Sequence, residues 1–166
     1  LCRGDVVMLC SDGLSGLATT EQIHEMLGSG DELVRCAQRR PVLFFEEPVF
    51  THGTAHLALD PVAPGVNVLT PHLPEGTAAP DAEFLQRRML EAFLHERGVR
   101  TPALWFYTPM ALPVTAGLDP SLVVYDCMDE LSAFAHAPPA LRERERALLE
   151  RADLVFTGGQ SLYEAK

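Results

Sequence analysis

The chain has 166 residues, the length of one ordinary domain, and 47% of them are hydrophobic, enough for a substantial core. Its formal net charge of −10 argues against a nucleic-acid-binding surface, because phosphate backbones are bound by clustered Lys and Arg, and Lys166 is the only lysine. No apolar run is long enough to cross a bilayer, and the start has neither an initiator Met nor a signal peptide. We expect no nucleic-acid partner, no transmembrane segment and a cytoplasmic location, in a chain that is internal to something longer.

The cysteines and histidines show no ligand pattern. Cys2, Cys10, Cys36 and Cys127 are widely separated, so neither a zinc site nor a disulfide framework is indicated. The histidines fall mostly in predicted loops without a carboxylate or cysteine companion. We expect reduced thiols and no cofactor in this chain.

The start of the chain predicts a strand, two helices and a second strand. Residues 6–10 are a short apolar run that a glycine-containing turn closes. Thr20 is a suitable N-cap for a helix over residues 21–27, and glycines separate this helix from another over residues 31–39. Residues 42–45 are apolar again and predict a buried strand.

Residues 49–79 are rich in Pro, Gly, Thr and His. Such residues favour turns and interrupt regular structure. We expect loops lying over one edge of the fold, with a single strand at residues 66–69 and no domain boundary.

A strongly patterned helix follows. Asp81 is its predicted N-cap and Gly98 its stop signal. Five apolar side chains are expected to share its buried face: Phe84, Leu85, Met89, Phe93 and Leu94. Residues 103–107 and 122–125 predict strands, and residues 109–117 between them have room only for a short helix.

The last part of the chain predicts helix, strand and helix. Pro138 and Pro139 start a helix whose Arg and Glu residues are expected to face water. Its inward residues are expected to be Leu141, Leu148, Leu149 and Ala152. Residues 153–157 form the last strand, and the glycine pair at 158–159 opens a final helix around residues 161–166.

Apolar strands that alternate with amphipathic helices predict an α/β fold with a doubly wound, mostly parallel sheet covered on both sides. In such folds ligands bind beyond the carboxyl ends of the strands. The polar residues that follow each strand are therefore the candidates for a functional site.

Four segments resemble bacterial nucleotide-sugar-dependent glycosyltransferases of the GT-B fold. They are Arg40-Pro-Val-Leu-Phe-Phe-Glu-Glu-Pro, Trp105-Phe-Tyr-Thr-Pro-Met, Tyr125-Asp-Cys-Met-Asp-Glu-Leu-Ser-Ala-Phe and Ala152-Asp-Leu-Val-Phe-Thr-Gly-Gly-Gln-Ser-Leu-Tyr-Glu-Ala-Lys. The resemblance runs from about residue 40 to residue 166. It implies the Rossmann-like, acceptor-side half of a GT-B fold, truncated before the domain that binds the nucleotide sugar. The implied partners are a nucleotide-sugar donor and a glycan or lipid acceptor.

The start of the chain resembles a different family. Gly4-Asp-Val-Val-Met-Leu-Cys-Ser-Asp-Gly-Leu-Ser-Gly-Leu-Ala-Thr-Thr-Glu-Gln-Ile is similar to the late core motif of PPM-type metal-dependent Ser/Thr protein phosphatases, over residues 1 to about 34. This resemblance implies that Asp12 is a ligand of a Mg²⁺ or Mn²⁺ pair. The family's other metal-binding aspartates have no counterpart in this chain, and one carboxylate does not hold two hard cations.

The two resemblances divide the chain into residues 1–39 and residues 40–166, as a chimera of two fragments. The glycosyltransferase part lacks its own first strand, which is central in a doubly wound sheet, so its loss would expose two strand edges. We predict that residues 6–10 fill this position, between the strands at 42–45 and 103–107. Asp12 would then lie near Asp126 at the carboxyl edge.

Asp126 and Asp129 are the candidate catalytic residues, because they leave the carboxyl end of a predicted central strand. Glycosyl transfer needs a group that takes or orients the acceptor hydroxyl proton, and a carboxylate also stabilises an oxocarbenium-like centre. The structural alternative is that Asp129 caps the next short helix and Asp126 accepts backbone N–H bonds in the turn.

The candidate substrate-binding residues follow the other strands: Tyr107, Thr108, Glu130, Gly158 and Gly159. The glycine pair offers backbone N–H groups to a phosphate or sugar oxygen, or else forms a tight turn that only glycine permits. Trp105 and Phe106, just inside their strand, are expected in the core.

The leading functional hypothesis is a fragment of an enzyme that transfers a sugar from a nucleotide donor to an acceptor, inactive alone because the donor-binding half is missing. The alternatives are a fragment of a metal-dependent phosphatase and an inert folded fragment that only packs or binds a partner. The sequence does not identify the donor sugar, the acceptor or the stereochemical outcome.

Overall fold

The computed structural model describes residues 6–9, 42–135 and 137–166. Its strands are β1 (Val6–Leu9), β2 (Val42–Phe45), β3 (Val49–Thr51), β4 (His56–Ala63), β5 (Val66–Pro74), β6 (Ala103–Phe106), β7 (Leu122–Cys127) and β8 (Leu154–Thr157). Its helices are α4 (Ala79–Glu96), α5 (Leu141–Arg151), α6 (Gln160–Ala165) and two 3₁₀ helices, η1 (Pro109–Thr115) and η2 (Leu131–Ala133). The predicted helices over residues 21–27 and 31–39 lie outside the described residues, as does Asp12.

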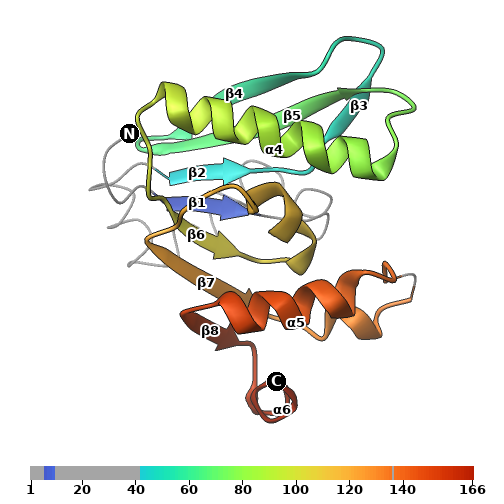
Figure 1. Cartoon of the computed structure of the whole chain (residues 1–166). Coiled ribbons are helices and arrows are strands. Elements are labelled where there is room, and N and C mark those ends of the chain that lie inside the picture. Colours follow the sequence, from blue (N-terminus) through green and yellow to red (C-terminus); the bar gives the residue numbers. More distant parts are fainter. Residues whose placement is uncertain (1–5, 10–41, 136) are drawn as a thin grey trace.

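The strands form one sheet in which β5, β2, β1, β6, β7 and β8 are neighbours in that order (Figure 1). Each of these neighbouring pairs is parallel. The chain runs outward from β1 through β2 to β5, then returns to β6 and continues outward on the other side. This reversal confirms the prediction of a doubly wound, mostly parallel α/β sheet and places its switch point between β1 and β6.

β1 fills the position that the sequence assigns to it. Val6 pairs with Val42 of β2 on one side and with Ala103 of β6 on the other, and the register continues through Leu9. The strand therefore has hydrogen-bonded neighbours along both edges, which confirms the predicted placement.

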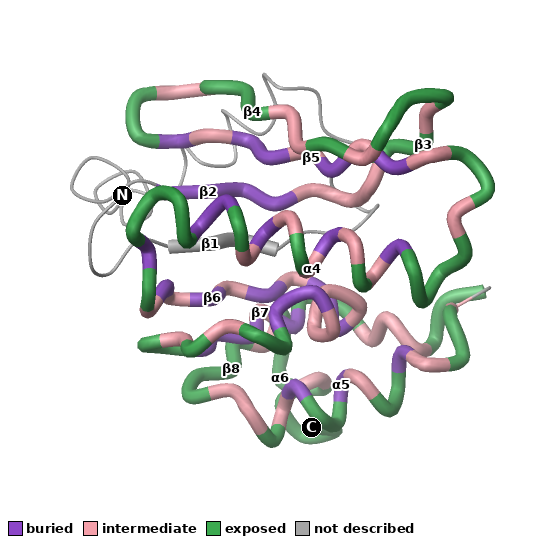
Figure 2. Tube along the Cα trace, turned by 45° about the horizontal axis from the view of Figure 1, so that its top comes forward, coloured by how far each residue is buried: buried purple, intermediate pink, exposed green. Residues whose placement is uncertain are grey.

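β2 shows why the central strands are apolar throughout. All four of its residues are buried (Figure 2). Leu43 and Phe45 belong to the larger core cluster, whereas Val42 and Phe44 belong to a second cluster. Because successive side chains of a strand point to opposite faces, both faces of the sheet are buried at this strand.

α4 and α5 lie on the same side of the sheet (Figure 1), which we call the helical face. The larger core cluster fills the space between them and the sheet and includes Leu90 of α4, Leu148 of α5 and Phe106 of β6. The other side, the opposite face, carries the second cluster with Trp105 and Tyr107 packed against it. Phe106 is therefore in the core as expected, whereas Trp105 is only partly buried. No helix within the described ranges is long and apolar enough to cross a membrane.

The predicted strand at residues 66–69 is confirmed as part of β5, but the prediction of loops over the rest of residues 49–79 was wrong, because β3, β4 and the remainder of β5 occupy much of this segment. β4 pairs antiparallel with β5 at the edge of the sheet, and its register shifts between Pro61 and Ala63. An edge strand with such an irregularity tolerates proline. Pro71 of β5 is tolerated for a related reason, because it lies opposite the interruption between β2, which pairs with residues 66–69, and β3, which pairs with residues 72–74.

The predicted start and buried face of α4 need correction. Ala78, not Asp81, is the N-cap, no side chain caps the helix, and Asp81 lies in the first turn. Phe84 is exposed and lies under the guanidinium of Arg87, 5.6 Å from its ring centre. The buried residues are Ala82, Gln86, Leu90, Phe93 and Leu94. Gly98 follows the helix with φ +71°, a left-handed conformation that favours glycine, so the predicted stop signal is confirmed.

α5 also differs from its prediction. It begins at Leu141 with Ala140 as N-cap, after the prolines at 138 and 139 that were predicted to start it. Leu141 and Leu148 are buried, but so is Glu145, which was expected to face water. These three residues share a stripe at i, i+4 and i+7. Glu145 is buried because it accepts a hydrogen bond from the Tyr125 hydroxyl at 2.9 Å.

Candidate functional site

The switch point between β1 and β6 directs attention to the carboxyl ends of the central strands. β6 is followed there by Tyr107 and Thr108, and β2 by Glu46, Glu47 and Pro48. In doubly wound folds a crevice for ligands opens at this place, because the connections leave the sheet in opposite directions on its two sides.

A cavity of about 150 Å³ lies at this edge on the helical face. It is lined by Phe45, Glu46, Glu47, Pro48, Glu83, Gln86, Thr108, Met110, Ala111, Val114 and Arg144. A larger hollow of about 680 Å³ lies at the other edge, lined by residues such as Gly98 and Arg100 before β6 and Gly117 before β7. Ligands of doubly wound folds bind at the carboxyl edge, so the smaller cavity is the candidate site.

Arg144 of α5 is held in place at the wall of this cavity. Its Nη2 donates a hydrogen bond to Glu83 Oε1 of α4 at 2.7 Å, and its Nη1 donates one to the Met110 carbonyl of η1 at 3.3 Å. Both side chains of the ion pair are largely shielded from solvent. The pair joins the two helices above the strand ends and fixes the orientation of the guanidinium.

Two further polar side chains of the lining have assigned partners. Glu46 accepts a hydrogen bond from the Thr70 hydroxyl at 2.7 Å. Thr108 is buried, and its hydroxyl oxygen accepts a hydrogen bond from the Met110 backbone N–H at 3.2 Å, which caps η1. Thr108 is thus the one predicted site residue that lines this cavity among the residues described, whereas Tyr107 packs against the cluster on the opposite face.

Asp126 projects from the opposite face of β7. Its neighbours Tyr125 and Cys127 belong to the core of the helical face, and side chains alternate along a strand. Asp126 is in register with Phe156 of β8, whose ring stacks on Trp105 at 5.7 Å. Burial raises the pKa of the Asp126 carboxyl, and the nearby Trp105 indole offsets this in part. The indole Nε1 of Trp105 is itself buried and makes no hydrogen bond of good geometry with any described atom.

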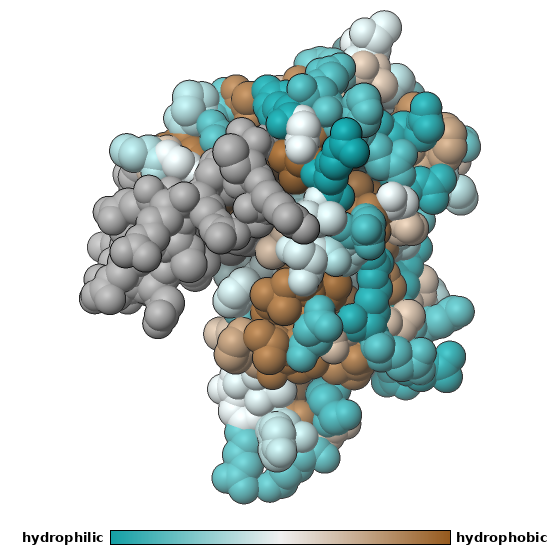
Figure 3. All heavy atoms as spheres, turned by 60° about the vertical axis from the view of Figure 1, so that its left-hand side comes forward, coloured by the Kyte–Doolittle hydropathy of each residue, from teal (hydrophilic) through white to brown (hydrophobic). Residues whose placement is uncertain are grey.

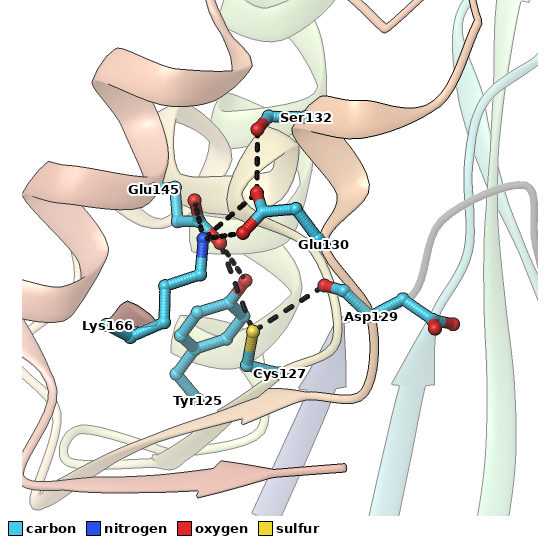
Figure 4. Close-up of polar contacts among 7 residues, drawn as sticks. All are labelled: Tyr125, Cys127, Asp129, Glu130, Ser132, Glu145 and Lys166. Carbon is cyan, nitrogen blue, oxygen red and sulfur yellow. Dashed lines mark hydrogen bonds and ion pairs between the residues drawn. The ribbon is translucent and has the colours of Figure 1, made fainter. Parts of the chain in front are cut away.

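Asp129 and Glu130 belong to the turn after β7, and their side chains have different surroundings. Glu130 forms an ion pair with Lys166 at 2.9 Å and accepts a hydrogen bond from Ser132 at 2.6 Å. Figure 4 shows the Asp129 carboxylate directed away from this group. Asp129 does not cap η2, because the N-cap is Glu130 and no side chain makes a capping bond.

Lys166 links Glu130 to the buried Glu145 (Figure 4). Its Nζ lies 2.6 Å from Glu145 Oε2, and the other Glu145 oxygen accepts the Tyr125 hydroxyl. Burial raises the pKa of Tyr125, and the hydrogen bonds around it act in the same direction. Burial alone would lower the pKa of Lys166, but the two carboxylates outweigh it and raise the pKa. The network anchors the chain after α6 to α5, so its geometry supports a structural role for Glu130.

The two glycines after β8 differ in their environment. The N–H of Gly158 donates to the Cys127 carbonyl at 3.0 Å, and a side chain at this position would collide with the Met128 carbonyl. Gly159 is the extended N-cap of α6 and has open space where a side chain would project. Gly158 therefore fits the tight-turn interpretation, in which only glycine is accommodated.

The sequence did not identify Arg144, Glu83, Glu46 or Glu145 as important residues. The spacing of Glu145 with Leu141 and Leu148 could have indicated its burial. The Arg144–Glu83 pair joins residues 61 positions apart, so no local pattern reveals it. In the described ranges no group of three or more His, Cys, Asp or Glu side chains is arranged to hold a metal ion.

No protein-family model matches the chain, and no curated protein matches it. Among solved structures it is similar to an E. coli trehalose-6-phosphate protein bound with UDP-2-fluoro glucose, with 11% identity and a TM-score of 0.48 over 93% of this chain and 39% of that chain. It is also similar to the α,α-trehalose 6-phosphate synthase of Burkholderia multivorans, with 10% identity and a TM-score of 0.48 over 93% of this chain and 40% of that chain. A third similar structure is the UDP-forming α,α-trehalose-phosphate synthase of Burkholderia xenovorans in complex with glucose-6-phosphate, with 16% identity and a TM-score of 0.45 over 92% of this chain and 40% of that chain. This chain spans about two fifths of the length of each, and likenesses this weak support no statement about its activity.

Proposed function

We propose that the chain is the acceptor-side domain of a nucleotide-sugar-dependent glycosyltransferase. The observation that carries the proposal is the cavity beside the switch point of a doubly wound sheet, with hydroxyl, carboxylate and guanidinium groups along its wall. The four segments that resemble glycosyltransferases contain β2, β6, β7 and β8, and each continues beyond its strand at the carboxyl edge of the sheet. The donor is expected to be held by another domain.

In the proposed reaction an acceptor hydroxyl attacks the anomeric carbon of the nucleotide sugar. The new C–O bond forms as the bond to the nucleotide phosphate breaks, the nucleoside diphosphate leaves, and a base takes the hydroxyl proton. The proposed candidates for this base are Asp126 and Asp129. Neither residue lines the cavity and Asp126 projects from the opposite face of β7, so either would act on an acceptor hydroxyl that extends beyond the cavity at the carboxyl edge of the sheet.

The proposal is tested by titrating the chain with methyl glycosides and, separately, with nucleotide sugars, while amide chemical shifts are recorded. We expect saturable shifts with the glycosides at residues around the cavity and none with nucleotide sugars. Glu46→Gln should weaken glycoside binding, whereas Glu96→Gln at the other edge should not. Binding of neither sugar type would favour an inert fragment and overturn the proposal.

A further inference from the structure

The described lining of the cavity is predominantly acidic. It contains the carboxylates of Glu46, Glu47 and Glu83 and the single guanidinium of Arg144. Even without counting Glu47, the described lining holds two carboxylates, Glu46 and Glu83, against one guanidinium. An anionic ligand would therefore meet more negative than positive charge from these groups, in surroundings partly shielded from solvent where charges interact more strongly than in water.

The one positive group of the described lining, Arg144, is already paired with a carboxylate. Arg144 is bound to Glu83 at 2.7 Å and to the Met110 carbonyl at 3.3 Å, and its side chain is only 20% exposed. A phosphate that captured Arg144 would displace Glu83 and leave this carboxylate partly buried without its partner, which is costly. The arrangement therefore does not offer Arg144 to a phosphorylated ligand.

The size and remaining chemistry of the cavity suit part of one sugar ring. Its volume of about 150 Å³ lies below the roughly 300–1,000 Å³ of pockets that enclose a whole small-molecule ligand, so it has room for one face of a sugar and not for a nucleotide. Phe45, Pro48 and Val114 supply apolar wall for the C–H face of a pyranose, while carboxylates and the Thr108 hydroxyl match its hydroxyl groups.

We infer that the acceptor is an uncharged or amine-bearing sugar and that the cavity discriminates against sugar phosphates. This inference rests on the proposed function, which it deepens by naming the acceptor class. The ammonium group of an amino sugar would complement the acidic lining, whereas a phosphate would add about two negative charges to it.

The test compares three ligands by calorimetry and amide shifts with the full chain at neutral pH and low salt: methyl glucoside, methyl glucosaminide and glucose 6-phosphate. We expect the glucosaminide to bind at least as tightly as the glucoside, and glucose 6-phosphate to bind about tenfold more weakly or worse. Raised salt should narrow these differences, because it screens charge. Tighter binding of glucose 6-phosphate than of the glucoside would overturn the inference.

Glu83→Gln provides a sharper arm of the test. It releases Arg144, so affinity for glucose 6-phosphate should rise while affinity for the glucoside changes little. Glu83→Asp, which keeps the charge, should behave like the original chain and serves as a second variant, and urea unfolding confirms that both are folded. Unchanged phosphate affinity in folded Glu83→Gln would contradict the inferred role of the pair.

The outcomes separate the inference from the proposed function. Sugar binding with a preference for phosphate would overturn only the inference. If the glucoside and the glucosaminide bind more tightly than glucose 6-phosphate, but the full-length protein transfers no sugar from any nucleotide sugar, only the proposed function would be overturned. Failure of all three ligands to bind would overturn both.

Discussion

The partly buried carboxylate of Asp126 is expected to lower the stability of the fold, and it is also a candidate for the catalytic base. On the opposite face it lies near the stacked rings of Trp105 and Phe156, where it is partly shielded from solvent. Glu145, only 6% exposed, is more deeply buried but has Lys166 and the Tyr125 hydroxyl as partners. The contrast indicates a structural role for Glu145, whereas Asp126 is a partly buried charge that only the Trp105 indole compensates in part, and such charges are common at functional sites.

We expect Asp126→Asn to increase the free energy of unfolding at neutral pH. The folded-state pKa is raised above the ordinary value of 3.8, so the folded protein holds this proton more tightly than the unfolded chain does. Stability from this group is therefore present at low pH and is lost as the pH rises from about 3.8 through the raised folded-state pKa. Because the Asn side chain does not titrate, the variant should lose less stability than the original chain as the pH rises. Urea unfolding of both proteins between pH 4 and pH 8 would measure this difference in the free energy of unfolding.

Asp129→Asn is the matched control, since its carboxylate points away from the neighbouring network and the substitution should change stability little (Figure 4). A lower stability of Asp126→Asn at neutral pH would mean that the native carboxylate makes a favourable contact. The same variant addresses function in the full-length protein, where loss of transfer together with gained stability would be consistent with the role proposed for Asp126.

At the scale of elements, the turn from β8 into α6 depends on close packing against the turn that follows β7. Gly158 lies against the Met128 carbonyl, and its N–H bonds the Cys127 carbonyl. The strand β8 itself is an edge strand whose Leu154 and Phe156 are half exposed, and Figure 3 shows hydrophobic surface low on the molecule, where β7 and β8 lie. The contact at Gly158 therefore helps to fix the turn from β8 into α6 against the turn after β7.

We expect Gly158→Ala to destabilise the chain by about 1–3 kcal/mol, because the added methyl group meets backbone rather than a flexible side chain. Gly159→Ala is the control, since nothing lies within 4 Å of its added carbon and its extended φ of −179° suits any residue. Thermal unfolding of the two variants gives the comparison. Equal stability of both would show that the turn relaxes without cost and that the glycine at 158 has another role.

At the scale of the whole molecule, the sequence predicted the parallel sheet because its central strands are short apolar runs separated by helical patterns. It also predicted the place of β1, since a doubly wound sheet with a missing central strand has one open position. The β4–β5 hairpin was missed because Pro61, Pro71 and Pro74 resemble loop residues, and only the pairing shows that they lie where the ladder is shifted or interrupted. The cavity was missed because Glu83 and Arg144 come together only through packing of α4 and α5.

The central position of β1 leads to a prediction for the whole chain. Removal of residues 1–39 deletes the partner of both β2 and β6, so two buried, apolar strand edges would be exposed and the sheet would divide at its switch point. We expect the shortened chain to lose its cooperative unfolding transition and to associate, as measured by circular dichroism on heating and by size-exclusion chromatography. Val7→Pro in the full chain should have a similar effect, since proline in a central strand removes a ladder hydrogen bond, whereas Val7→Ala should remain folded. A monomeric shortened chain with unchanged thermal stability would show that β2 and β6 do not depend on β1, and that residues 40–166 form the sheet without it.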